Sequence, residues 1–149
     1  MRRRIALAAV AALVAAPGLH AQEQIVERFV AAFNAADVDA LVGLHSPTAV
    51  RLPPNQPPVM GHEALRDHFL EQLTEYAFVQ LSAQQDGQHV AETFAVSWGT
   101  YELNVIPESG AEEFTETGHW MSIVWQQARS DEWLIERTIW NPDSPPPEG

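Results

Sequence analysis

The sequence contains no cysteine and no lysine, and both absences limit what the protein can do. Without cysteine, no disulfide can stabilise the fold and no cysteine nucleophile is available, so stability must come from packing. The basic side chains number 8, all of them arginine, against 20 acidic ones, and the net charge is −12. Nucleic acids and anionic membrane surfaces require clustered basic side chains, so we exclude both as partners.

The first residues have the order of a secretory signal peptide. Arginines occupy residues 2–4, an apolar run follows over residues 5–16, and Pro17-Gly18 precedes the small residue Ala21. The apolar run is shorter than the ~20 residues that a membrane span requires. We expect a signal peptide over residues 1–21, cleaved after Ala21, and a periplasmic or secreted protein. The alternative is an uncleaved anchor, because Leu19 stands where cleavage sites usually have a small residue.

Helical periodicity dominates the first half of the remaining chain. Apolar residues from Ile25 to Phe33 recur every three to four positions, which predicts a helix with one buried face. Asp37 is placed to cap a second short helix, and residues 48–52 are typical of a short strand. The prolines of the following PPNQPP segment predict a loop, and a third helix is expected to begin at Gly61.

After Thr74 the pattern changes to that of strands. Residues 76–85 and 88–106 are rich in β-branched and aromatic residues, and Asp86-Gly87 between them predicts a two-residue hairpin turn. Two further strands are expected over residues 111–127 and 132–141. The proline-rich segment 142–149 is expected to be a disordered tail, which leaves one domain over residues 22–141.

The order of elements predicts an α+β fold. Three N-terminal helices each need a partner for their apolar stripe, so they are expected to pack on one face of a strongly curved, mainly antiparallel sheet. A long curved sheet that helices close on one side leaves a cone-shaped cavity, which is the usual place for a small ligand in such a fold.

Several stretches resemble a known family. ERFVAAFNAADVDALVGLHSPTAVRLPPNQPPVMGHEALRDHF is similar to the helical opening of SnoaL-like and ketosteroid-isomerase-like proteins of the nuclear transport factor 2-like superfamily. AVSWGTYEL, GHWMSIVWQQ and EWLIERTIWN are similar to their strands, so the resemblance covers residues 25–141. It implies a cystatin-like α+β barrel with a conical cavity, and it implies no particular reaction, because the superfamily holds enzymes and binding modules alike.

The resemblance also shows what this chain lacks. A steroid isomerase of the family has a general-base aspartate where this chain has Leu52, and an oxyanion tyrosine where it has Phe29. Its second aspartate would fall within residues 118–121, which contain no carboxylate. Neither leucine nor phenylalanine exchanges a proton, so isomerisation by the family's usual mechanism is not expected.

Two titratable residues are candidates for chemistry. His119 shares strand parity with Met121 and Trp125, which predicts that it faces the cavity as an acid, a base or a ligand-orienting donor. Its alternative is a histidine that is hydrogen-bonded within an apolar strand. Glu136 shares parity with Trp140 and could face the cavity with a raised pKa, or else form an ion pair with a neighbouring arginine on the sheet surface.

Large apolar side chains are candidates for the wall of the cavity, and their alternative role is plain core. The predicted ligand-binding set is Phe29, Phe33, Leu52, Phe94, Trp98, Met121, Trp125 and Trp140. No metal is expected, because Arg66 stands where a zinc helix that begins at His62 needs its second histidine. The acidic residues Glu112, Glu113 and Glu116 are interpreted as a solvated strand edge, and no sequence motif indicates a cofactor.

These observations favour an exported domain that binds a small neutral or cationic hydrophobic molecule. Two alternatives stay open. One is a cofactor-independent isomerase, cyclase or dehydratase that uses His119 and Glu136. The other is a dimeric interaction domain without a ligand. A homodimer is expected in any case, because proteins of the resembled family usually pair through the sheet face turned away from the helices. The direction in which His119 and Glu136 point distinguishes the enzyme from the other two.

Overall fold

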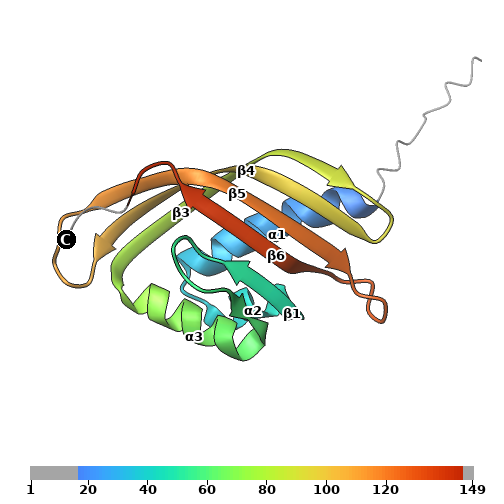
Figure 1. The fold of residues 1–149 in the computed structure, drawn as a ribbon, viewed down its shortest axis with the longest axis horizontal. Helices are drawn as coiled ribbons and strands as arrows, with labels where there is room; N and C mark the ends of the chain where they lie inside the picture. The colour runs from blue at the N-terminus through green and yellow to red at the C-terminus, as the bar shows by residue number, and fades with distance from the viewer. Residues whose placement is uncertain (1–16, 146–149) are drawn as a thin grey trace, which may run out of the picture.

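The computed structural model describes residues 17–145 of the chain, and its α+β architecture agrees with the sequence-based prediction (Figure 1). Three helices precede or interrupt the strands: α1 (Pro17–Asn34), α2 (Val38–Gly43) and α3 (Gly61–Thr74). The strands are β1 (His45–Leu52), β2 (Val59–Met60), β3 (Tyr76–Val90), β4 (Phe94–Pro107), β5 (Phe114–Gln126) and β6 (Trp133–Pro142). The arginines and the apolar run of the predicted signal peptide lie outside the described residues, whereas its expected cleavage site lies within α1.

The six strands form one mostly antiparallel sheet in the order β2-β1-β6-β5-β4-β3. The pair β1–β6 is parallel, and α3 with the long strands provides the connection that a parallel pair needs. In Figure 1 the long strands β3 to β6 arch over α1, while α2 and α3 lie beside them. The helices therefore cover the inner face of the curve, as the apolar stripes required.

Helix packing follows the predicted stripes. Ile25 and Phe33 of α1 are buried, and so are Leu65 and Phe69 of α3. The side chain of Asp37 accepts a hydrogen bond of 2.9 Å from the backbone N–H of Ala40, which caps α2 as its position predicted. These contacts anchor the helices on the sheet and leave the space between α1, α3 and the long strands open.

The predicted hairpin turn at Asp86-Gly87 is wrong. Strand β3 runs through both residues with a register shift at Gly87, and the turn to β4 follows Val90. Gly87 has no positive φ. A Cβ atom at Gly87 would lie 2.5 Å from Cζ2 of Trp98, so this glycine is needed for close packing of the indole ring and not for a turn.

The beginning of the proline-rich tail is held against β5. Pro142 is the last residue of β6, and the Asp143 N–H donates to the carbonyl of Thr117 at 2.8 Å. The Thr117 hydroxyl donates to the Asp143 carboxylate at 2.9 Å. Residues 146–149 of the predicted tail lie outside the described part of the chain. Among the helices that are described, none combines the length and apolar character of a membrane span.

Candidate functional site

A cavity of about 600 Å³ lies between α1, α3 and the inner face of the sheet. That volume is within the range of sites for small ligands. Helix α1 contributes an apolar wall, because Ile25, Phe29 and Phe33 follow one another at helical spacing. The opposite walls are more polar and include His68, Gln72, Tyr101, Glu116, Trp120 and Trp140.

Arg51 is the central charged group of this cavity. It shares strand parity with the fully buried Ala49, so β1 directs both side chains inward. The side chain is only 4% exposed, and its guanidinium carbon lies 5.4 Å from the ring centroid of Phe29, 4.6 Å from Phe69 and 4.5 Å from Trp140. Its Nε and Nη1 atoms are buried without a hydrogen-bond partner among the described residues. Burial lowers the pKa of Arg51 to about 9.

The cavity-facing side of α3 adds neutral polar groups near this charge. Burial and the positive charge of Arg51 lower the pKa of His68, with Glu71 opposing, so the imidazole is neutral at pH 7. His68 Nε2 and Gln72 Oε1 are buried, and neither has a hydrogen-bond partner in the described part of the chain. His68 and Gln72 are four residues apart, so both face the cavity from the same side of the helix.

A second polar pair occupies the sheet wall. The Tyr101 hydroxyl donates a hydrogen bond of 2.7 Å to Oε1 of Glu116. Burial raises the pKa of Tyr101, and its hydrogen bond to the Glu116 carboxylate raises it further. Glu116 thus lines the cavity, whereas the sequence interpretation had placed it on a solvated strand edge. Its parity with Trp120, which also lines the cavity, explains the difference.

Three of the eight predicted ligand-binding residues line the cavity, namely Phe29, Phe33 and Trp140. The other five do not. Phe94, Met121 and Trp125 lie on the outer face of the sheet, with exposures of 43%, 46% and 51%. Trp98 packs over Gly87 with its ring centroid 5.1 Å from that of His89, also on the outer face. Leu52 follows Arg51 on β1 and therefore points to the opposite side of the strand.

His119 is also on the outer face. Its side chain is 63% exposed, and its Nδ1 lies 3.0 Å from Oδ1 of Asp143. The prediction assigned the cavity-facing positions of β5 one residue out of place. Trp120 and Ser122, and not His119, are the side chains that line the cavity. His119 therefore ties the chain that follows β6 to β5 and is remote from any bound ligand in the cavity.

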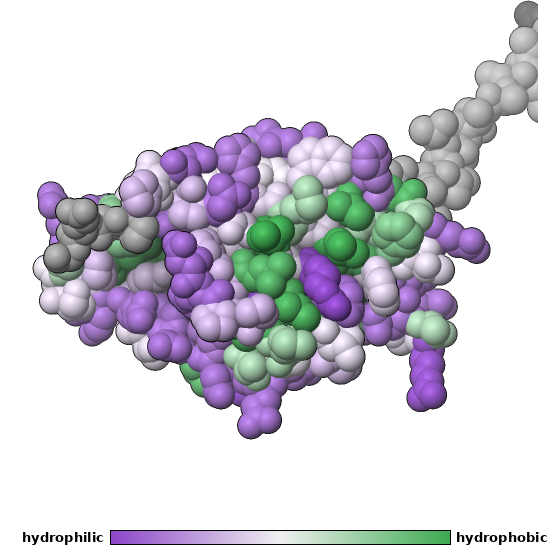
Figure 2. All heavy atoms as spheres, viewed as in Figure 1, coloured by the Kyte–Doolittle hydropathy of each residue, from purple (hydrophilic) through white to green (hydrophobic). Residues whose placement is uncertain are grey.

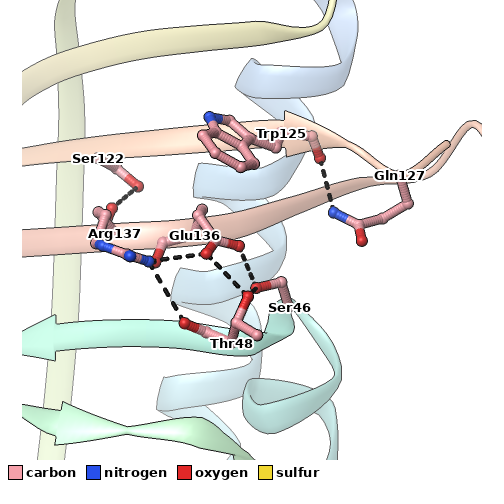
Figure 3. A network of polar contacts seen from close by, with 7 residues as sticks. All are labelled: Ser46, Thr48, Ser122, Trp125, Gln127, Glu136 and Arg137. Atoms are coloured by element: carbon pink, nitrogen blue, oxygen red, sulfur yellow. Dashed lines mark hydrogen bonds and ion pairs between the residues drawn. The ribbon is translucent and has the colours of Figure 1, made fainter.

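Glu136 belongs to a polar network between β1 and β6 (Figure 3), and it is not among the residues that line the cavity. Ser46 donates to its Oε2, Thr48 donates to its Oε1 at 3.0 Å, and Arg137 Nη1 lies 2.8 Å from the same oxygen. Burial alone would raise the pKa of Glu136, but these hydrogen bonds and the Arg137 charge outweigh burial and lower it. The ion pair with Arg137 corresponds to the alternative prediction for Glu136, but the carboxylate is buried and does not lie on the sheet surface.

A register shift explains why Glu136 departs from the parity of its neighbours. Val124 pairs with Ile135 while Ile123 pairs with Arg137, so Glu136 is an extra residue in β6. Ile135 and Thr138 both line the cavity on either side of this bulge. The sequence carried no clear sign of it. Arg51 was missed as well, and its one signal in the sequence is that it alternates with Ala49 on the same side of β1.

Comparisons with known proteins agree with this architecture. Residues 26–127 match the model of a family described as SnoaL-like domain. A conserved protein from Planctomyces limnophilus has a similar structure, with a TM-score of 0.72 and 25% identity over 83% of this chain and 96% of that one. A ketosteroid isomerase-like protein from Erwinia carotovora gives a TM-score of 0.76 and 17% identity over 87% and 98% of the two chains.

A nuclear transport factor 2-like superfamily protein from Salmonella enterica is similar as well, with a TM-score of 0.75 and 15% identity. That likeness covers 90% of this chain and 98% of the Salmonella protein. A search of curated proteins gives no match.

Proposed function

Because the chain belongs to the SnoaL-like domain family of the nuclear transport factor 2-like superfamily, we propose that it binds a small molecule with an apolar body in its cavity. The observation that carries this proposal is the cavity itself, about 600 Å³ in volume with the aromatic walls Phe29, Phe33 and Trp140. Burial of an apolar ligand there contributes roughly 25 cal/mol for each Å² removed from water, before the costs of association.

The positions of the candidate catalytic residues support binding over the enzyme alternative. His119 and Glu136 both lie outside the cavity, so neither reaches a ligand atom there. The family's general-base position carries Leu52 and its oxyanion position carries Phe29, which removes contributions of about 10²–10⁴-fold in rate for each group. The ligand therefore binds without ketosteroid isomerisation.

Tryptophan fluorescence tests the cavity directly. We expect a neutral naphthalene amide to change the emission of Trp120 and Trp140, both of which line the cavity. Trp140→Ala should weaken binding roughly tenfold, or about 1.4 kcal/mol, because it removes one aromatic wall. Trp98→Ala is the matched control on the outer face and should leave affinity unchanged. Equal affinity in wild type and Trp140→Ala would argue against the cavity as the binding site.

The proposal includes export. The charged, apolar and small-residue regions of residues 1–21 occur in the order of a signal peptide. The intact mass of the protein from a periplasmic extract should correspond to a chain that begins at Gln22. A full-length mass, or retention in the cytoplasm, would refute this part of the proposal.

A further inference from the structure

We propose that Arg51 is an anion-binding residue and that the ligand of this cavity carries a carboxylate group on its apolar body. This inference rests on the proposed binding function and specifies the chemical class of the ligand. It replaces the neutral or cationic ligand that the sequence alone suggested.

The guanidinium of Arg51 lacks a partner among the described residues. A buried charge is normally paired, because removing an ion from water without compensation costs several kcal/mol. Arg51 is 4% exposed, yet Nε and Nη1 have no hydrogen-bond partner and the described residues place no ion-pair partner beside it. Three aromatic rings offset part of this cost through cation–π contacts but provide no hydrogen-bond acceptor. The guanidinium therefore has donors left for a ligand.

The charged side chains that line the cavity limit the charge of that ligand. Arg51 is the one basic side chain among the described residues that line the cavity, apart from the neutral His68. Glu71, Glu75 and Glu116 line the same cavity and repel additional negative charge. A single guanidinium matches a singly charged carboxylate, whereas a phosphate dianion requires more donors than this cavity offers.

Polar groups on α3 next to Arg51 bear on how the ligand is oriented. His68 Nε2 and Gln72 Oε1 are also buried without partners, and His68 is close enough to Arg51 for that charge to lower its pKa. A carboxylate that contacts Arg51 can accept a hydrogen bond from His68 in the tautomer that carries its proton on Nε2, whereas Gln72 Oε1 is itself an acceptor and offers the carboxylate no donor. The body of the ligand then extends along the apolar residues of α1 and against Trp140.

The experiment compares two compounds of the same shape, 2-naphthylacetate and 2-naphthylacetamide, by calorimetric titration. Wild-type protein should bind the carboxylate roughly tenfold to a hundredfold more tightly than the amide, as expected for a hydrogen-bonded ion pair. Arg51→Met should lose this preference while it still binds the amide. Arg66→Met is the matched control, because Arg66 is exposed and pairs with Asp39 on the surface at 2.5 Å.

A thermal-shift measurement on the wild type keeps the test independent of how the variant folds. The carboxylate should raise the melting temperature more than the amide does. Equal binding of both compounds by the wild type would overturn the carboxylate site and leave the binding function standing. Binding of neither compound would overturn the proposed function as well. Stabilisation by inorganic phosphate equal to that by naphthylacetate would show a general anion site and refute the specific ligand class.

Discussion

His45 illustrates, at the scale of a single residue, how the charge in the cavity affects the core beneath it. Its side chain is 1% exposed, its Nδ1 donates to the Leu41 carbonyl at 2.7 Å, and its ring lies 5.8 Å from that of Phe69. Burial, followed by repulsion from Arg51, lowers the pKa of His45 to about 3. The imidazole is therefore neutral in the folded protein over a wide range of pH.

This shift predicts a loss of stability in acid. The unfolded state binds a proton at His45 near pH 6.5, whereas the folded state binds it only near pH 3, so acid favours unfolding. The contribution is fully present above pH 6.5, and from there down to about pH 3 His45 should lower the free energy of unfolding by up to roughly 1.4 kcal/mol per pH unit. Urea unfolding at several pH values measures this slope. His45→Gln should reduce it, and an unchanged slope in that variant would contradict the assigned burial.

Residue types alone did not identify the important polar groups of the cavity. Arg51, His68 and Glu116 gain their roles from burial and from their neighbours, which single positions in a sequence do not reveal. The absence of the isomerase residues at Leu52 and Phe29 could be derived from the family resemblance, because it depends only on which residue stands at a matched position. Arg51, the charged group that does lie in the cavity, could not be predicted from residues at matched positions.

Element boundaries were largely predictable, whereas the faces of the strands were not. The helices that begin near Val38 and Gly61 follow from an N-cap and from periodicity, and the structure confirms both. On β5 and β6 apolar residues occur on both faces, so a period of two cannot show which face meets the helices. The bulge at Glu136 further changes the parity along β6.

The close contact between Gly87 of β3 and Trp98 of β4 leads to a prediction about stability. Gly87→Ala should destabilise the protein by about 1–3 kcal/mol, because the new methyl group would meet the indole ring of Trp98. Trp98→Ala in the same chain should remove most of this additional cost. Gly43→Ala is the control, since its added Cβ would meet no atom within 4 Å apart from its chain neighbours and the backbone of its own helix. Chemical denaturation of Gly87→Ala, Trp98→Ala, the double variant and Gly43→Ala measures the coupling between the two positions, and strictly additive effects would exclude the proposed contact.

At the scale of the whole molecule, the outer sheet face suggests self-association. Large apolar side chains gather there, and Figure 2 shows a hydrophobic patch over β5 and β6 on the side turned away from α1. Met121, Trp125 and Ile139 are 46%, 51% and 49% exposed. We propose that a second copy of the chain covers this patch in a homodimer, since apolar patches that remain exposed mark interfaces.

Sedimentation of the purified protein tests the dimer. The wild type should sediment as a dimer at micromolar concentration, and Ile139→Glu should sediment as a monomer because a charge would be buried at the interface. Leu70→Glu is the control, because Leu70 is 46% exposed on α3, away from this face. A monomeric wild type would refute the proposal, as would an Ile139→Glu variant that remains dimeric.

We propose that the cavity between α1, α3 and the sheet binds a small molecule, and native mass spectrometry with added 2-naphthylacetate tests this binding most directly. Ala83 lines the cavity, whereas its neighbour Ser82 is exposed on the opposite face of β3. We predict one bound ligand per subunit in the wild type and in Ser82→Trp, and none in Ala83→Trp, in which the indole fills the cavity. Absence of a complex in the wild type, or an equal complex in Ala83→Trp, would contradict the account.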